Sequence, residues 1–238
     1  MTARTAILTD TIRRSPAPAL HVANMASSRA TAAAVVGPLD QQMLLMGATM
    51  SYPRNAEIFG ENETADYLYK VVSGSVRTYK ILSDGRRQIG GFYLPGDIFG
   101  LEFDDEHALS AEAVTDAKVL VVKRSALNAL AGRDASIGAQ LFALIGRELR
   151  RAQDHVVLLI QSAQERVAGF LLEMAERSPL STAIELPMSR QDIADYLGLT
   201  IETVSRTLTS MEDAAAIELA TSRRIVVRNR NALRRMNG

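Results

Sequence analysis

The fold is decided by residues 189–211, which read SRQDIADYLGLTIETVSRTLTSM. Ser189 can cap a helix, and Asp192 three residues later is close to the second half of a capping box. Gly198 permits the positive φ of a tight turn, and Thr200 can cap a second helix. Two short helices joined by a glycine-containing turn predict a helix-turn-helix, whose second helix lies in the major groove of DNA.

The second helix of this motif combines an apolar face with a polar one. Val204, Leu208 and Met211 recur at spacings of four and three, so we expect them to point inward. The outward face carries the residues that we expect to contact bases, which are Ile201, Glu202, Ser205 and Arg206. Arginine can hold guanine O6 and N7 with two hydrogen bonds, and glutamate can accept one from cytosine N4. A surface helix of any α-domain can also carry Glu and Arg four residues apart as a salt bridge. The pair alone is therefore a weak signal, and the pattern of the whole segment 189–211 is more specific.

A basic β-hairpin is predicted directly after the two helices. Residues 217–219 and 225–228 have the composition of short strands, and together they make the motif a winged helix. The chain as a whole balances 27 basic against 27 acidic residues, but beyond residue 220 it has arginines and no acid. Such a local patch suits phosphate contacts, which we expect from Arg223 and Arg224. A solvated basic tail explains the last two arginines equally well.

The N-terminal half of the chain has a different texture. Residues 38–134 alternate short β-branched or aromatic runs with turn signals, and Asp84-Gly85 between two such runs predicts a hairpin. Many short strands at regular spacing predict a jelly roll or small barrel. Residues 1–37 are rich in Ala, Ser, Thr and Pro without a sustained period, so we expect a mobile N-terminal tail.

Residues 135–162 switch to helical spacing. A long helix with a narrow apolar seam after a β-domain is typical of a coiled-coil dimer interface, although a helix packed on its own domain is the alternative. The predicted interface residues are Leu141, Ile145, Ala152, Val156 and Leu159. Residues 163–238 are then assigned to the winged helix-turn-helix domain.

Composition and motifs argue against several classes of site. The chain has no cysteine, and its three histidines lie far apart, so we expect no disulfide and no metal site. There is no Gly-rich phosphate loop and no Gly-x-Ser-x-Gly elbow, so we expect no enzyme, no catalytic residue and no cofactor. The acidic run at residues 104–106 is explained by a solvated loop. No apolar run approaches the ~20 residues that span a bilayer, and we expect a cytoplasmic protein without membrane contact.

Beyond the tail, the chain resembles the Crp/Fnr superfamily of bacterial transcription regulators, and most closely its FixK-type branch. The strongest piece is residues 186–206, LPMSRQDIADYLGLTIETVSR. The resemblance implies an α+β protein with a cyclic-nucleotide-binding-like β-roll, a long dimerisation helix and a C-terminal winged helix-turn-helix. It also implies a homodimer on double-stranded DNA that reads palindromes with TTGA-like half-sites, with Arg206 on guanine and Glu202 on the cytosine or adenine edge.

Other positions are interpreted through the same resemblance. Ile201 stands where the cyclic AMP receptor protein has an arginine, which makes a TGTGA-type site less favourable, and it could contact a thymine methyl instead. The positions that match phosphate contacts of the family are Ser189, Gln191, Thr200 and Thr203. Family members activate transcription by touching RNA polymerase, and the exposed turn at residues 83–87 resembles one such surface, although an ordinary hairpin turn explains it as well. By resemblance, the regulated genes belong to low-oxygen or respiratory metabolism.

The resemblance supplies no sensor ligand. Residues 95–100, PGDIFG, look like a turn of the family's β-roll, but Leu109 replaces the arginine that holds the phosphate in cyclic AMP binders. A buried phosphate without its cation is unfavourable, so we expect no cyclic AMP. The cysteines that hold an iron–sulfur cluster in the oxygen-sensing branch are also missing. A protein whose main event is capture of some other small molecule is the competing hypothesis.

Overall fold

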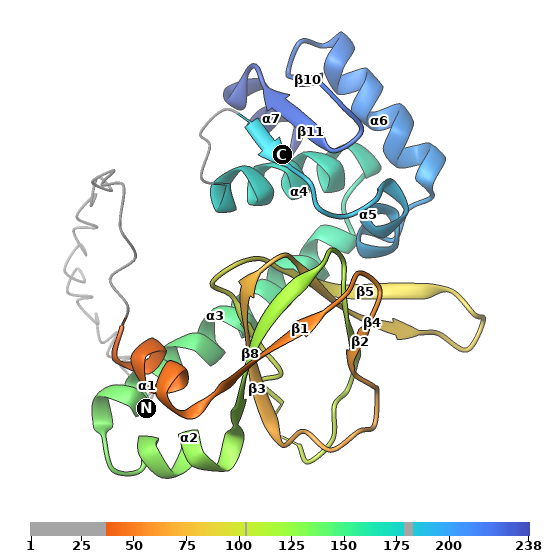
Figure 1. Ribbon diagram of the computed structural model, residues 1–238. Helices are drawn as coiled ribbons and strands as arrows, with labels where there is room; N and C mark the ends of the chain where they lie inside the picture. The colour runs from red at the N-terminus through yellow and green to blue at the C-terminus, as the bar shows by residue number, and fades with distance from the viewer. Residues whose placement is uncertain (1–36, 103, 179–182) are drawn as a thin grey trace, which may run out of the picture. The chain divides into compact units, whose positions relative to one another are not determined.

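The computed structural model describes residues 37–102, 104–178 and 183–238, and the prediction of a mobile tail falls outside these ranges apart from its last residue. Along the described chain, a β-rich part is followed by a long helix and then by a small domain of helices and short strands (Figure 1). None of the helices in these ranges is both long enough and apolar enough to cross a membrane.

Two four-stranded antiparallel sheets build the β-rich part. The first sheet contains, in spatial order, β1 (Ala48–Tyr52), β8 (Ala117–Lys123), β3 (Tyr67–Ser73) and β6 (Ile98–Phe99). The second contains β2 (Glu57–Phe59), β7 (Ser110–Ala113), β4 (Val76–Ile81) and β5 (Arg87–Tyr93). Apolar side chains from both sheets share one core, in which Val71, Val76 and Val119 are fully buried. The two sheets with a common core confirm the predicted β-roll.

The predicted hairpin is β4–β5. Gly85 has φ +83°, a left-handed conformation that glycine adopts without steric cost, and the N–H of Leu82 donates to the carbonyl of Arg86 at 2.8 Å. The carboxylate of Asp84 accepts from the backbone N–H of Arg86 at 3.0 Å, which closes the turn locally. Asp84-Gly85 was therefore sufficient to predict the hairpin, because hydrogen bonds between residues of the turn itself hold it.

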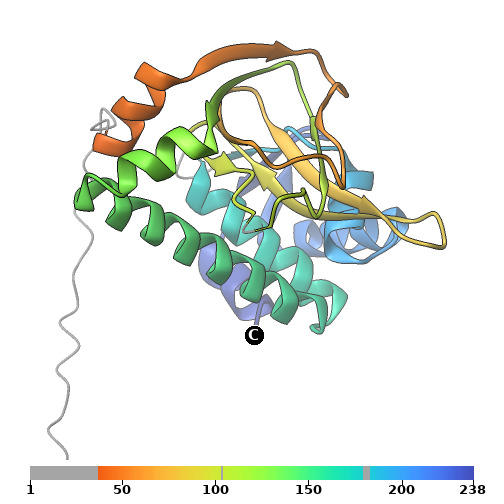
Figure 2. The same ribbon diagram turned by 90° about the horizontal axis from the view of Figure 1, so that it is seen from below.

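Three helices accompany the β-roll, of which only the third was predicted. They are α1 (Pro38–Met46), α2 (Arg124–Ala131) and α3 (Ala135–Leu159). Met43 of α1, Leu127 of α2 and Ile137 of α3 are buried in one core cluster, so the short helices are held by packing. Figure 2 shows the orange α1 and the light-green α2 beside α3. Their brevity gave no periodic signal of its own. Asp134 caps α3 by accepting from the N–H of Ser136 at 2.8 Å.

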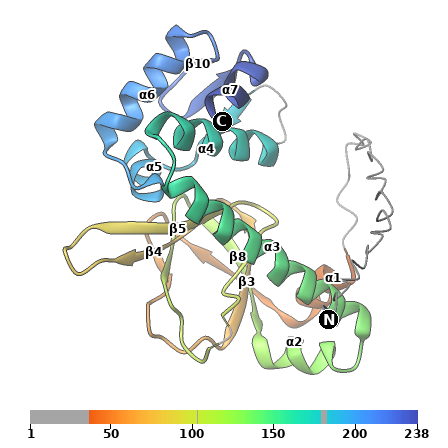
Figure 3. The same cartoon turned by 180° about the vertical axis from the view of Figure 1, so that it is seen from behind.

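The C-terminal part is a winged helix-turn-helix, as predicted. Its helices are α4 (Ala163–Arg177), α5 (Arg190–Leu197), α6 (Ile201–Asp213) and α7 (Arg230–Met236). Its antiparallel sheet has the order β10 (Ile217–Leu219), β11 (Arg224–Val227), β9 (Ala183–Glu185). The last two arginines lie on α7 rather than on a solvated tail, because Asn229 caps this helix and Leu233 anchors it in the core with no exposed surface. Figure 3 shows α3 leading from the β-roll to α4.

Candidate nucleic-acid interface

The first helix of the motif, α5, is fixed at both ends by its own sequence. At its start, Asp192 accepts from the N–H of Ser189 at 2.9 Å, and the N–H of Asp192 donates to Ser189 Oγ at 3.1 Å. This reciprocal pair is the predicted capping box. At its end, Gly198 is left-handed with φ 62°, and its N–H donates to the carbonyl of Ala194. The predicted turn is thereby confirmed.

The second helix, α6, presents a defined face outward because its other face is buried. Thr200 caps it by accepting from the N–H of Thr203 at 3.2 Å. Val204, Leu208 and Met211 are at most 2% exposed, as predicted. The burial of these three residues fixes the rotation of α6 about its axis, and so decides which residues face solvent.

The residues predicted to contact bases come together on that outward face. Glu202, Ser205 and Arg206 are exposed and Ile201 is half-buried. Within the described chain, Glu202 and Arg206 form no ion pair, so the guanidinium and the carboxylate are both available to a ligand. An unpaired arginine and an unpaired glutamate one turn apart can serve as donor and acceptor to base edges in a groove.

The predicted phosphate contacts gather at the starts of the two helices. Ser189 and Gln191 lie at the start of α5, while Thr200 and Thr203 lie at the start of α6, where their hydroxyl oxygens are 3.0 Å apart. Ser189 Oγ donates to Asp192 Oδ2 at 2.8 Å, so this hydroxyl has no second hydrogen for a phosphate. Gln191 donates from Nε2 to Asp195 Oδ1 at 2.6 Å and is otherwise exposed. The backbone N–H groups at a helix start are natural anion donors.

Arg190 is a further candidate, which was not among the residues predicted from the sequence. It is half-buried, and its Nη1 has no hydrogen-bond partner among the described residues. Burial lowers the pKa of this guanidinium, and Arg190 forms no ion pair within the described ranges. A cation in the first turn of a helix is also opposed by the helix dipole unless an anion is present. The sequence feature that could have identified Arg190 is an arginine directly after the capping serine, which indicates an anion-binding position.

The wing carries arginines of unequal availability. Arg223 is exposed and forms no ion pair within the described ranges. Arg224 lies 3.4 Å from Glu185, between Nε and Oε1, on an open part of the surface. Arg228 forms an ion pair with Glu218. Arg223 is therefore the freer of the two predicted phosphate contacts, while Glu185 partly neutralises Arg224.

The long helix α3 exposes an apolar stripe. Phe142, Leu149 and Val156 recur every seven residues and are 79%, 59% and 64% exposed. Ile145 and Ala152 fall between them, which completes a heptad pattern of alternating three and four. The predicted seam was drawn through Leu141 and did not include Phe142 or Leu149. The structure packs Leu141 against the core that α3 shares with α1 and α2, so this side chain serves its own domain.

The comparisons with known proteins agree with this architecture. Residues 49–134 match the cyclic nucleotide-binding domain, and residues 165–236 match the Crp-like helix-turn-helix domain. The chain is 50% identical over 203 residues to the nitrogen fixation regulation protein FixK of Azorhizobium caulinodans, which covers 83% of this chain and 82% of that relative. The chain belongs to the Crp/Fnr family. A second FixK, from Rhizobium meliloti, is 40% identical over 185 residues and covers 77% of this chain and 84% of its own.

The structure of FixK2 from Bradyrhizobium japonicum is similar at a TM-score of 0.78 and 50% identity, over 81% of this chain and 98% of that one. Both comparisons place the chain in the FixK-type branch of the Crp/Fnr family, as predicted. It is a transcription regulator with a helix-turn-helix DNA-binding domain, and not an enzyme.

A cavity of about 280 Å³, open to the surface, lies between the strands of the β-roll and α3 in this Crp/Fnr regulator. Leu109 lines it, in place of the arginine expected of a cyclic AMP binder. Glu102 also lines it, with Oε2 buried and without a hydrogen-bond partner. Arg151 of α3 reaches the same cavity, but its Nη2 donates to the carbonyl of Phe92 at 2.5 Å. A phosphate in this cavity would meet Leu109, the carboxylates of Glu102 and Glu148, and a guanidinium that Glu148 and Glu173 already neutralise.

Proposed function

We propose that this regulator binds as a homodimer to a DNA palindrome with TTGA-like half-sites and activates transcription. The observation that carries the proposal is the unpaired, exposed set of Glu202, Ser205 and Arg206 on α6, whose opposite face is buried. Such a helix can enter a major groove, with Arg206 on guanine and Glu202 on the neighbouring base. The flanking phosphates would then be contacted by Arg190, Gln191, Thr200, Thr203, Arg223 and Arg224. Ser189 would hold the start of α5, because both of its donors bind Asp192.

The homodimer is supported by the apolar stripe of α3. Its residues are Phe142, Ile145, Leu149, Ala152, Val156 and Leu159. The half-burial of Leu159 and the packing of Leu141 on its own domain make the centre of the helix the stronger part of the seam. The division into a β-roll at 38–134, a dimerisation helix at 135–162 and a DNA-binding domain at 163–238 belongs to the same proposal.

The regulated genes and the partner follow from the relatives. One relative is named fumarate and nitrate reduction regulatory protein, from Escherichia coli, at 29% identity over 207 residues. Together with the FixK relatives, this supports control of low-oxygen or respiratory metabolism in the cytoplasm. RNA polymerase would contact the turn at residues 83–87, of which the first four are exposed and Arg87 is half-buried. Leu109 and Glu102 in the β-roll cavity support a protein that does not use cyclic AMP.

The proposal is tested by selecting bound sequences from a random DNA pool with the full-length protein. We expect enrichment of a palindrome whose TTGA-like half-sites lie about one helical turn (~10 bp) apart. A pool that yields no palindrome would contradict the proposal. Enrichment of single half-sites alone would support base recognition by α6 but contradict binding as a homodimer.

The role of Arg206 is tested by Arg206→Ala with Arg223→Ala as the matched control. Loss of a bidentate guanine contact costs about 1–3 kcal/mol per half-site and relaxes the preference at that base. The wing variant should weaken binding to all sequences alike, because phosphates carry no base identity. Binding curves on the palindrome and on duplexes substituted at the guanine distinguish the two. A uniform loss with Arg206→Ala would leave it only a phosphate role.

A further inference from the structure

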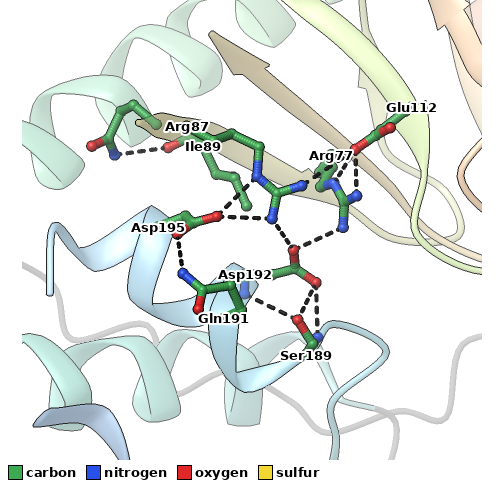
Figure 4. A network of polar contacts seen from close by, with 9 residues as sticks. Arg77, Arg87, Ile89, Glu112, Ser189, Gln191, Asp192 and Asp195 are labelled. Atoms are coloured by element: carbon green, nitrogen blue, oxygen red, sulfur yellow. Dashed lines mark hydrogen bonds and ion pairs between the residues drawn. The ribbon is translucent and has the colours of Figure 1, made fainter. Parts of the chain in front are cut away.

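Two arginines of the β-roll reach across to the first helix of the DNA-binding domain. Arg77 lies on β4 and Arg87 at the start of β5. Asp192 on α5 accepts from Arg77 Nη1 at 2.8 Å and from Arg87 Nη2 at 2.6 Å, both on its Oδ1 atom (Figure 4). One carboxylate of the DNA-binding domain thus accepts hydrogen bonds from two neighbouring strands of the β-roll.

The network has carboxylates on both sides of the two arginines. Glu112 of β7 accepts from Arg77 Nε at 2.6 Å, and its Oε1 lies 3.5 Å from Arg87 Nη1. Asp195 of α5 accepts from Arg87 Nε at 2.9 Å. Although burial disfavours its charge, the hydrogen bond to Asp195 and the charge of Asp192 raise the pKa of Arg87. Arg77 therefore joins Glu112 of the β-roll to Asp192 of α5, and Arg87 joins Glu112 to both Asp192 and Asp195.

Burial gives these contacts a directional role. The side chains of Arg77 and Asp192 are 8% and 6% exposed. A buried ion pair adds little net stability over an apolar contact, but a planar guanidinium meets its carboxylates in only one geometry. Ile89 of β5 shares a buried apolar core with Ile193 and Leu197 of α5, but the burial of apolar surface is non-directional. We therefore assign the angle between α5 and the β-roll to the arginines.

Asp192 also connects this angle to the DNA-contacting surface. While Oδ1 receives the two arginines, Oδ2 accepts from the N–H and the hydroxyl of Ser189, which closes the capping box. Asp195, which receives Arg87, holds Gln191 through its other oxygen. The acids that accept from the β-roll thus hold two of the predicted phosphate contacts at the start of α5.

We propose that Arg77 and Arg87 are positioning residues for DNA reading. They hold α5, and with it α6, at one angle to the β-roll and its helix α3, so that the two α6 helices of a dimer meet half-sites at one separation. This inference rests on the proposed function. It predicts that these arginines, which touch no DNA, set the selectivity for half-site spacing.

The test compares duplexes that differ only in spacing. Wild type, Arg87→Gln and Asp195→Asn are titrated against the selected palindrome, against palindromes with one base pair inserted or deleted, and against a single half-site. We expect both variants to lose about tenfold on the palindrome while their binding to the other duplexes changes much less, because only the fixed angle is lost. Arg54→Gln, an exposed arginine of the β-roll, is the control and should keep wild-type selectivity.

Two further measurements distinguish a positioning role from a general loss of stability. Because Arg87 and Asp195 contact each other, the double variant should lose little more spacing selectivity than either single variant. Asp195→Asn keeps the side-chain shape and removes one of three acids around two arginines, so its melting temperature should stay near that of wild type.

Several outcomes would overturn the inference. They are an equal loss on every duplex, additive losses in the double variant, unchanged spacing selectivity in both variants, or a wild type that binds all spacings alike. A wild type that binds no palindrome would instead refute the proposed function, so the two failures are distinguishable.

Discussion

At the residue scale, single side chains at the ends of α5 determine how the reading motif is built. Gly198 ends α5 in a left-handed conformation, with φ 62°. A Cβ atom at this position would lie 3.4 Å from Leu159 Cδ2, an ordinary contact, so the backbone conformation and not space requires glycine. At the other end of the helix, Arg190 is half-buried without a partner for Nη1. Gly198 therefore stabilises the turn of the motif, whereas Arg190 is available to a ligand.

Gly198→Ala should lower the free energy of unfolding by about 1–2 kcal/mol, because a β-carbon disfavours the left-handed region. Gly198→Asn should cost less, since asparagine tolerates this conformation. Chemical denaturation of the two variants measures the difference. Equal losses would show that contact with Leu159, rather than backbone conformation, sets the cost.

Arg190→Ala should weaken binding uniformly across DNA sequences, because we expect this arginine to neutralise a phosphate. The slope of log K against log salt should become shallower by about 0.9 for each phosphate that Arg190 neutralises in the wild type. Binding measured over a salt series gives this slope. Arg133→Ala, an exposed arginine between α2 and α3, should leave the slope unchanged. A wild-type slope in Arg190→Ala would remove this residue from the interface.

At the scale of elements, α3 has one buried apolar face and one exposed apolar face. Ile137 and Leu144 are buried in its own domain, whereas Phe142, Leu149 and Val156 point away from that domain. The two sets lie on different faces, so the same helix can hold the β-roll and still offer a seam to a second copy. The exposed set has the seven-residue period of a coiled coil.

Leu149→Glu should convert the dimer to a monomer, because two carboxylates would face each other in the seam. Light scattering of the purified protein measures the mass, and binding to the palindrome should fall with it. Ala143→Glu introduces the same charge at an exposed position outside the heptad and should remain dimeric. A dimeric Leu149→Glu protein would place the interface elsewhere.

At the scale of the whole molecule, apolar packing as well as ion pairs join the DNA-binding domain to the rest of the described chain. Ile89, Phe92 and Val114 of the β-roll belong to the same buried cluster as Phe170, Leu171 and Tyr196. His155 of α3 adds a polar contact, with Nε2 2.8 Å from the carbonyl of Tyr196 and its ring stacked on that tyrosine at 4.0 Å. Burial lowers the pKa of His155, against the opposing effects of this hydrogen bond and of Glu173.

Because burial lowers the pKa of His155, we expect stability to depend on pH. Unfolded histidine titrates near about 6.5, so the contribution of His155 is complete above that pH and is lost as pH falls through the lower folded pKa. The melting temperature of wild type should therefore drop more between about pH 7.5 and pH 5.5 than that of His155→Gln, which keeps a donor but does not titrate. Thermal unfolding at the two values measures this. Parallel decreases would show that His155 does not carry the effect.

The sequence by itself determined the local features of this protein. The capping box of Ser189 and Asp192, the left-handed Gly198 and the Asp84-Gly85 hairpin are all held by hydrogen bonds between residues close in the chain. The outward face of α6 followed as well, because a period of 3.6 residues fixes which side chains share a face. The fold class and the reading helix could therefore be predicted.

Only the tertiary structure decided which distant groups meet. It placed Leu141 on its own domain and Phe142 in the exposed seam, a difference of one residue that an apolar pattern cannot assign. It also brought Arg77 to Asp192 across 115 residues of sequence. Periodicity specifies the faces of an element, whereas the packing of faces against one another depends on the whole fold, and the ion network between the domains belongs to that second kind.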